Sequence, residues 1–170
     1  PRLESWLSTS KHGEMAYMEN HFDMRLDPRL LVENCKSVVT LVFPYFPEKR
    51  LFLPGDLKVS TYAYGSDYHN VLKKKLKLLL KEFRTETGDV NGRVFVDSAP
   101  VLEKAWAVRN GTGWLAKHTN IIHPKQGSFF FLCEMLLDVE LSPDAPVTDH
   151  CGTCTRCIDA CPTEAIIAPY

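Results

Sequence analysis

The sequence predicts an α+β fold, because it contains both apolar, β-branched runs typical of strands and amphipathic helical patterns. The clearest strand is residues 36–43 (KSVVTLVF), which ends at Pro44. The clearest helix is residues 70–84, where apolar residues recur at helical spacing. An α/β arrangement is the alternative. We divide the chain into a domain over residues 1–142 and a cysteine-rich module, with its linker, over residues 143–170.

The first third of the chain predicts short helices followed by one buried strand. Residues 3–22 read as helical segments broken at residues 12–13, and Asp27-Pro28 opens a short helical turn. The strand of residues 36–43 follows. Residues 44–55 contain three prolines, so we expect a loop there.

The middle of the chain predicts a long helix after an aromatic loop over residues 62–69. The helix should bury an apolar side made of Val71, Leu72, Leu76, Leu79, Leu80 and Phe83.

Further strands and a helix complete the predicted domain. Residues 93–97 (RVFVD) predict a second strand, and Pro100 suits the first turn of a helix that Gly111 ends. We expect a turn and short helix over residues 111–117, a third strand over residues 129–133, and a linker over residues 143–146.

Composition limits the function classes. With 45% apolar residues the chain can form a core, and a net charge of -1 excludes a globally basic nucleic-acid binder, although not a local basic patch. No apolar run approaches the roughly 18 residues of a membrane span, and no signal-peptide pattern is present. Cys35 and Cys133 lie in apolar surroundings typical of buried free thiols. We expect a protein of the reducing cytoplasm.

Four cysteines near the C-terminus form a metal-ligand pattern. Cys151, Cys154, Cys157 and Cys161, with Pro162, match the spacing C-x2-C-x2-C-x3-C-P of bacterial ferredoxins, whose thiolates hold iron–sulfur clusters. In two-cluster ferredoxins the fourth cysteine ligates the other cluster. A zinc site is the alternative, but zinc sites usually use two separated cysteine pairs. A disulfide pair is a weaker alternative still.

No second cysteine run follows Pro162, and the chain starts at Pro1 without an initiator methionine. We therefore expect a fragment of a longer protein, in which the cysteine module is the first half of a truncated ferredoxin-like domain. Such a fragment should not hold a complete pair of clusters.

Asp97 is the sharpest candidate outside the cysteines. It lies where a strand ends and a helix is about to begin, the place where open α/β sheets bind ligands. Apolar neighbours such as Val96 and Val101 could keep its carboxyl protonated, as a general acid requires. The alternative is a helix N-cap.

Other charged residues offer weaker patterns. Glu103, Lys104 and Arg109 read as a solvated helix face. The six histidines show no metal-ligand spacing, but His69 stands out because it closes the aromatic loop. One helix face carries a basic stripe that could bind phosphates or could simply be solvated: Lys74, Lys77, Lys81 and Arg84.

The run VDSAPVLEKAWAVRNGTGWLAKHT (residues 96–119) resembles the epoxyqueuosine reductase family of the tRNA queuosine pathway. Four further stretches resemble that family in the same order. They are residues 13–15 (GEM), 25–31 (RLDPRLL), 62–69 (YAYGSDYH) and the ferredoxin run. The resemblance covers nearly the whole chain.

The resemblance implies a cobalamin-binding domain similar to nitroreductase-like and B12-trafficking folds. Two [4Fe–4S] clusters in a ferredoxin-like module would reduce the cobalamin, which in turn reduces epoxyqueuosine in the tRNA anticodon loop to queuosine. Asp97 matches the family's proton donor. The segments that match the corrin-lining regions contain Arg25, Tyr64, Tyr68, His69, Lys117, Asn120 and Ile121.

The implied partners are tRNA carrying epoxyqueuosine and an external electron donor such as a flavodoxin or ferredoxin system. We expect a monomer with no membrane association. The C-terminal region, where much of the tRNA contact is expected, has no counterpart in this sequence. Two alternatives remain: a related corrinoid enzyme such as a reductive dehalogenase, and a non-catalytic cobalamin-binding or electron-transfer module.

Overall fold

The computed structural model describes residues 2–48 and 58–169. Its centre is an antiparallel sheet of three strands in the order β1-β5-β2, formed by β1 (Ser37–Pro44), β5 (Phe130–Leu137) and β2 (Gly92–Phe95). The α+β class is therefore confirmed, and the α/β alternative is wrong for this sheet. Part of the predicted loop over residues 44–55 lies outside the described residues.

Strand β5 is the central strand of the sheet and contributes side chains to both of its faces. Ser37 of β1 and Gly92 of β2 both lie opposite Leu137, so β5 is covered along both edges. Side chains alternate across a strand. Cys133, Met135 and Leu137 therefore share one face, and Glu134 and Leu136 share the other. The predicted third strand was too short, because it stopped at Cys133, just before a buried glutamate.

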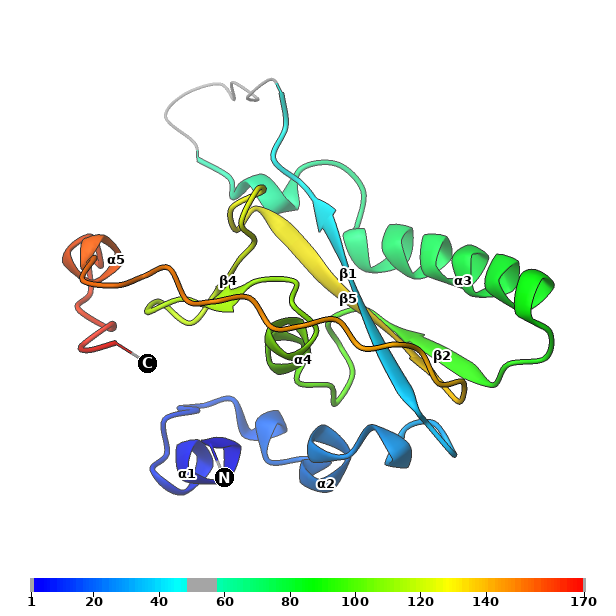
Figure 1. Cartoon of the computed structure of the whole chain (residues 1–170). Helices are drawn as coiled ribbons and strands as arrows, with labels where there is room; N and C mark the ends of the chain where they lie inside the picture. The colour runs from blue at the N-terminus through cyan, green and yellow to red at the C-terminus, as the bar shows by residue number, and fades with distance from the viewer. Residues whose placement is uncertain (1, 49–57, 170) are drawn as a thin grey trace.

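Helix α3 (Tyr68–Thr87) covers the first face of the sheet (Figure 1). Leu72, Leu76 and Leu80 repeat every four residues and are buried against β5 and β2. The prediction of this helix is confirmed. The predicted apolar side was too wide, however, because Val71 and Leu79 are exposed.

Helix α4 (Glu103–Arg109) packs on the second face, where Ala107 is fully buried. It begins three residues after Pro100, later than predicted. Strands β3 (Trp114–Leu115) and β4 (Ile121–Ile122) then pair as a second, small sheet. The predicted short helix over residues 111–117 is wrong. Gly113 permits the hairpin, because a Cβ there would lie 2.2 Å from the carbonyl oxygen of Ile122.

The N-terminal segments are short helices, as predicted, and lie away from α3 (Figure 1). Helix α1 spans Arg2–Ser8 and α2 spans Phe22–Leu26. Single 3-10 turns cover Ala16–Met18, Pro28–Leu30 and, before α3, Thr61–Ala63. Val32, which follows the second turn, packs with Phe95 and Leu136, so this region joins the core on the α4 face.

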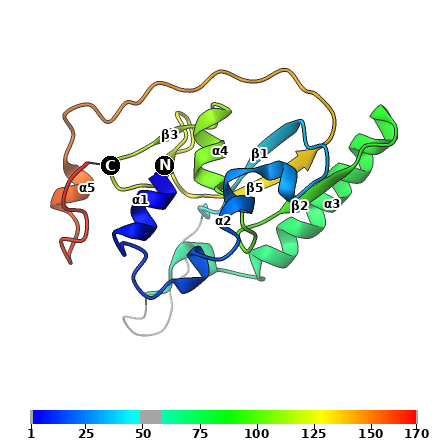
Figure 2. The same ribbon diagram turned by 90° about the horizontal axis from the view of Figure 1, so that it is seen from below.

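An extended segment follows β5 and passes α4 before it reaches the short helix α5 (Arg156–Asp159) (Figures 1 and 2). It runs close to the body of the protein, since a Cβ on Gly111 would meet the Ala145 carbonyl oxygen at 2.2 Å. The division at residues 142 and 143 stays a prediction. Across the described residues, no helix is long and apolar enough to cross a membrane.

Candidate active site

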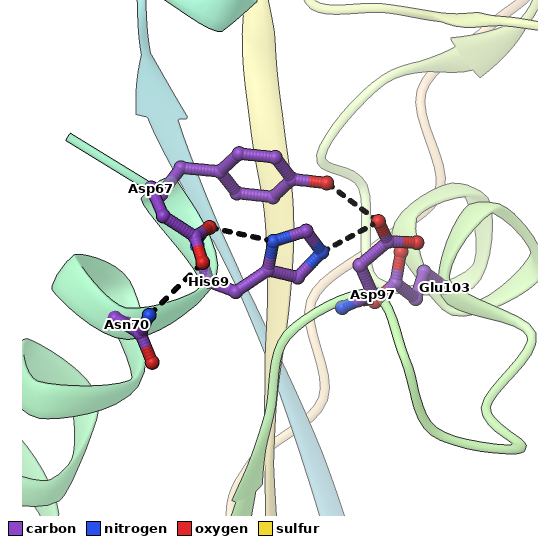
Figure 3. Close-up of polar contacts among 6 residues, drawn as sticks. Asp67, His69, Asn70, Asp97 and Glu103 are labelled. Atoms are coloured by element: carbon purple, nitrogen blue, oxygen red, sulfur yellow. Dashed lines mark hydrogen bonds and ion pairs between the residues drawn. The ribbon is translucent and has the colours of Figure 1, made fainter. Parts of the chain in front are cut away.

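Three chain segments meet at the N-terminal end of α3 and form the candidate active site (Figure 3). The first turn of α3 provides Tyr68 and His69, the loop after β2 provides Asp97, and the first turn of α4 provides Glu103. The structure therefore brings together Tyr68, His69 and Asp97, three residues that the sequence analysis selected.

Asp97 accepts two hydrogen bonds through one carboxylate oxygen. The Tyr68 hydroxyl donates to Asp97 Oδ2 at 2.5 Å, and His69 Nε2 lies 3.1 Å from the same atom. The other ring nitrogen of His69, Nδ1, lies 2.8 Å from Asp67 Oδ1. The imidazole thus bridges two carboxyl groups. Such a bridge can hold a proton and pass it from the histidine to Asp97.

Asp67 has two roles at the start of α3. Its side chain caps the helix by accepting a hydrogen bond from the His69 backbone amide at 2.9 Å. Its hydrogen bond with the ring is the main reason why the pKa of His69 is raised, and Asp97 adds to this effect. The same contacts lower the pKa of Asp67. His69 is therefore biased toward the imidazolium form.

The surroundings of Asp97 differ from the prediction. Its side chain is 58% exposed, so the expected enclosure by apolar neighbours is wrong. The sheet is antiparallel, so the ligand-site rule for parallel sheets does not apply to β2. The capping alternative is also wrong, because Leu102 holds the N-cap position of α4. Asp97 instead has a left-handed backbone, with φ of 55°, and points its carboxyl at Tyr68 and His69.

Glu103 is not part of a solvated face, contrary to the prediction. Its Oε1 accepts a hydrogen bond from the Asp97 backbone amide at 2.7 Å. Burial raises its pKa, and so does the neighbouring carboxyl of Asp97. Behind it lies Glu134, fully buried on β5, whose pKa is raised by burial and by Glu103. Glu134 was not among the predicted site residues, because a lone glutamate in an apolar run gives no sign of its burial.

An aromatic cluster adjoins the site. The ring of Tyr68 stacks on Phe131 with centroids 3.9 Å apart, and burial together with the Asp97 contact raises the pKa of Tyr68. Tyr68 therefore stays a hydrogen-bond donor at neutral pH. Ring contacts continue outward from Tyr68 to rings that are about half exposed, namely Phe46, Tyr62 and Phe129.

Two of the residues predicted to line a corrin lie outside the Asp97 cluster. The Arg25 guanidinium donates to the backbone carbonyls of Asn20 and Tyr17, both at 3.1 Å, and so braces the N-terminal segment. Tyr64 follows a 3-10 turn just before α3 and is half-buried. Their contact with a corrin stays a prediction.

The other three predicted residues have structural contacts on or near the small sheet. Lys117 is buried, and its Nζ donates to the carbonyl oxygens of Gly152 at 2.6 Å and Cys154 at 2.9 Å. Asn120 Oδ1 accepts from Lys104 Nζ at 3.1 Å. Ile121 is buried with Ala107 and Phe130 in an apolar cluster. Their roles toward a corrin also stay predictions.

The four cysteines of the ferredoxin run lie along one segment around α5. Among the described residues, no group of three or more possible metal ligands gathers around one point. Backbone amides near Ile166 and Thr163 lower the pKa of Cys161, which favours its thiolate. Cys133 is buried and Cys35 half-buried, as expected for structural thiols.

The basic stripe on α3 is narrower than predicted. Arg84 donates to the carbonyl oxygens of Val90 at 2.8 Å and Gly92 at 3.3 Å, so its guanidinium anchors the end of the helix. The three lysines of the stripe line an open depression of about 450 Å³: Lys74, Lys77 and Lys81. Asn70, Lys73 and Leu78 complete its lining. A larger cavity of about 740 Å³ lies between β1, α4 and residues 141–145, and none of the Asp97 cluster lines it.

Comparison with known proteins identifies relatives along the whole chain. Residues 25–98 match the family described as "Epoxyqueuosine reductase QueG, DUF1730". The epoxyqueuosine reductase of Cellulophaga algicola is 59% identical over 170 residues, which is 100% of this chain and 55% of that protein. The chain therefore spans about half the length of the curated relatives it matches.

Solved structures show the same similarity. The epoxyqueuosine reductase of Streptococcus thermophilus superposes with a TM-score of 0.88 at 31% identity, covering 99% of this chain and 47% of that one. An epoxyqueuosine reductase solved with an epoxyqueuosine-modified tRNA-Tyr stem loop gives a TM-score of 0.84 at 34% identity. That match covers 99% of this chain and 45% of the solved one.

Proposed function

We propose that this chain, which is similar to epoxyqueuosine reductases along its whole length, forms the part of such an enzyme that delivers a proton during reduction of epoxyqueuosine to queuosine in tRNA. The observation that carries the proposal is the Asp67–His69–Asp97 array, with Tyr68 as a further donor to Asp97. The array sits in a chain that resembles these enzymes from end to end.

The proposed chemistry needs a proton at one place. Opening an epoxide leaves an alkoxide, and removal of that oxygen requires protonation. Asp97 is exposed enough to meet a substrate, and it receives hydrogen bonds from two neighbours. His69, whose pKa is raised by Asp67, can resupply the proton through Nε2. Tyr68 orients the carboxylate, since its hydroxyl donates to the oxygen that also faces His69.

Cobalamin, when bound, would supply the reducing chemistry, with electrons delivered by iron–sulfur clusters. The exposed aromatic rings of Phe46, Tyr62 and Phe129 fit a broad, mostly apolar cofactor face, and they are linked through ring contacts to Tyr68. This platform supports a cobalamin-binding domain of the nitroreductase-like or B12-trafficking kind. Arg25, Tyr64 and the segment of residues 117–121 would border it.

The cysteine segment fits the donor chemistry of iron–sulfur clusters. Its spacing is that of ferredoxins, and the lowered pKa of Cys161 suits a thiolate ligand. Cys151, Cys154, Cys157 and Cys161 would hold clusters, with further ligands supplied from outside this chain. Lys117 joins this segment to the small sheet and so fixes it near the body of the protein.

We place the tRNA backbone along the lysine-lined depression on α3. The helix starts at the Asp97 cluster, so phosphates bound along Lys73, Lys74, Lys77 and Lys81 would lie beside the reacting nucleotide. A solved relative bound to a modified tRNA stem loop supports tRNA as the partner. A cytoplasmic, monomeric enzyme served by a flavodoxin or ferredoxin donor completes the proposal.

The test is turnover by the full-length protein reconstituted with cobalamin, iron and sulfide. The substrate is an anticodon stem loop that carries epoxyqueuosine, and nucleosides are identified by mass spectrometry. We expect loss of epoxyqueuosine matched by gain of queuosine. Protein that binds cobalamin and clusters but leaves the epoxide intact would contradict the proposed function.

A further inference from the structure

A buried acid without a partner lies behind the Asp97 loop. Glu134 is 0% exposed at the centre of β5, and within the described residues neither of its carboxylate oxygens has a hydrogen-bond donor. An ionised carboxylate buried without a donor is very costly. The alternation of β5 directs Glu134 toward the face on which α4 packs, and Glu103 begins that helix. The two carboxyl groups are neighbours.

A single proton would satisfy both glutamates. Two carboxylates offer only acceptors, so no hydrogen bond can form between them while both are ionised. When one is protonated, its O–H donates to the other, and the repulsion disappears. Burial raises the pKa of both carboxyls, and Glu103 raises the pKa of Glu134 further, whereas the contact with Glu134 lowers the pKa of Glu103. These opposite effects are those expected when Glu134 carries the proton and Glu103 accepts it. A shared proton is therefore the arrangement with the lowest cost at neutral pH.

The pair is connected directly to Asp97. Glu103 Oε1 accepts the Asp97 amide proton at 2.7 Å, while the Asp97 backbone holds a φ of 55° that a non-glycine residue rarely adopts. This conformation turns the Asp97 carboxyl toward Tyr68 and His69. Without the acceptor, the Asp97 amide loses this hydrogen bond, and among the described residues the Asp97 backbone keeps only the one that its carbonyl accepts from the Ala99 amide at 2.8 Å. The other titratable groups that face the pair are Lys104, Cys133 and Tyr68.

We propose that Glu103 and Glu134 share one proton and act as one positioning unit for Asp97. Glu134 holds the carboxyl of Glu103, and Glu103 in turn holds the Asp97 amide, so the acid that meets the substrate keeps its orientation. Both glutamates are positioning residues, because Glu134 is fully buried and Glu103 contacts Asp97 through its backbone amide. The proposed effect of the glutamates on catalysis rests on the proposed function of Asp97. The proposal that they share a proton does not depend on that function.

The shared proton can be tested without turnover. Infrared spectroscopy of the full-length protein at pH 7 detects the C=O stretch of a protonated carboxyl. We expect this band in the wild type and in the control Glu140→Gln, which changes an exposed glutamate. Glu134→Gln and Glu103→Gln should each remove it, because the new amide donates to the remaining carboxylate. If the wild type lacks the band, or if the band survives in both variants, the proposal that the two glutamates share a proton is wrong.

The positioning role is tested by turnover of the same full-length protein. Glu103→Ala removes the acceptor, so kcat should fall by about 10- to 100-fold, the scale of a misplaced catalytic group. The KM for the tRNA and the corrinoid absorption spectrum should not change. Glu103→Gln should restore most of kcat, since its amide oxygen can still accept from Asp97. If kcat fell equally in the alanine and glutamine variants, or fell in neither, the positioning role of Glu103 would be wrong.

The two claims fail separately. If Asp97→Asn turned over at the wild-type rate, the proposed role of Asp97 would be wrong, and the infrared result would still decide whether the glutamates share a proton. If Glu103→Ala lost corrinoid and thermal stability together with kcat, Glu103 would support the fold as a whole, and the positioning role would be refuted. Glu134→Gln keeps the side-chain shape and gives an independent test. Its kcat should be close to the kcat of Glu103→Gln.

Discussion

Replacing Lys117 by methionine should release the cysteine segment from the body of the protein. The buried ammonium donates two short hydrogen bonds, to the carbonyl oxygens of Gly152 and Cys154, and methionine keeps an unbranched side chain of similar shape without a donor. A hydrogen bond from a charged donor contributes about 1.5–3 kcal/mol. The released carbonyls can reach water in an exposed segment, so we expect a net local loss of about 2 kcal/mol rather than the sum of both bonds.

Amide hydrogen exchange measures this loss directly. At 1.4 kcal/mol per factor of ten, a local loss of about 2 kcal/mol predicts roughly 25-fold faster exchange in residues 151–161. Helix α3 should exchange as in the wild type, and Lys125→Met, at an exposed lysine, is the matched control. Unchanged protection of residues 151–161 would refute the prediction that Lys117 holds the cysteine segment. Faster exchange across the whole chain would assign Lys117 to the global fold instead.

Three further predictions follow from the charges of the site and of α3. Charge reversal at Lys74, Lys77 and Lys81 in the full-length enzyme should weaken tRNA binding and reduce its salt slope by about 1 per lost phosphate contact; an unchanged slope would assign these lysines to ordinary solvation. The folded-state pKa of Glu134 is raised above its unfolded-state value. The free energy of unfolding should therefore fall as pH rises from about 5 toward the folded-state pKa, and Glu134→Gln should flatten this decline in urea titrations. An equally steep decline in the variant would contradict a raised pKa at Glu134. Asp67→Asn removes the main cause of the raised pKa of His69, so the alkaline limb of kcat/KM should move to lower pH; a limb that does not move would exclude His69 as its source.

The main elements were predictable because their patterns are local. The β-branched run of β1 and the four-residue leucine repeat of α3 give strand and helix signals within a few residues of sequence. Strands β3 and β4 have two residues each, which is too short for any periodicity. Their pairing depends on the close approach of Gly113 to Ile122, a contact that a local pattern does not reveal.

The site was predictable in part, for a related reason. Asp97 stood out by its place after a strand and by the family resemblance, and His69 by its place after an aromatic loop. Their contact joins residues 28 positions apart. The roles of Glu103 and Glu134 were missed, because a charged side chain predicts exposure unless the tertiary structure is known. The expected apolar surroundings of Asp97 failed for a different reason: apolar neighbours in the sequence do not fix where a side chain points, and a left-handed backbone turns this carboxyl toward Tyr68 and His69.

The central claim is that Asp97 delivers a proton, and Asp97→Asn in the full-length enzyme tests it most directly. Asparagine keeps the shape of the side chain and removes its acid function. We predict wild-type corrinoid binding and cluster content, with reduction of the epoxide slower by about 100-fold or more, the usual scale for a lost general acid. Turnover near the wild-type rate with cofactors intact would contradict the claim, and another acid or water would then have to supply the proton.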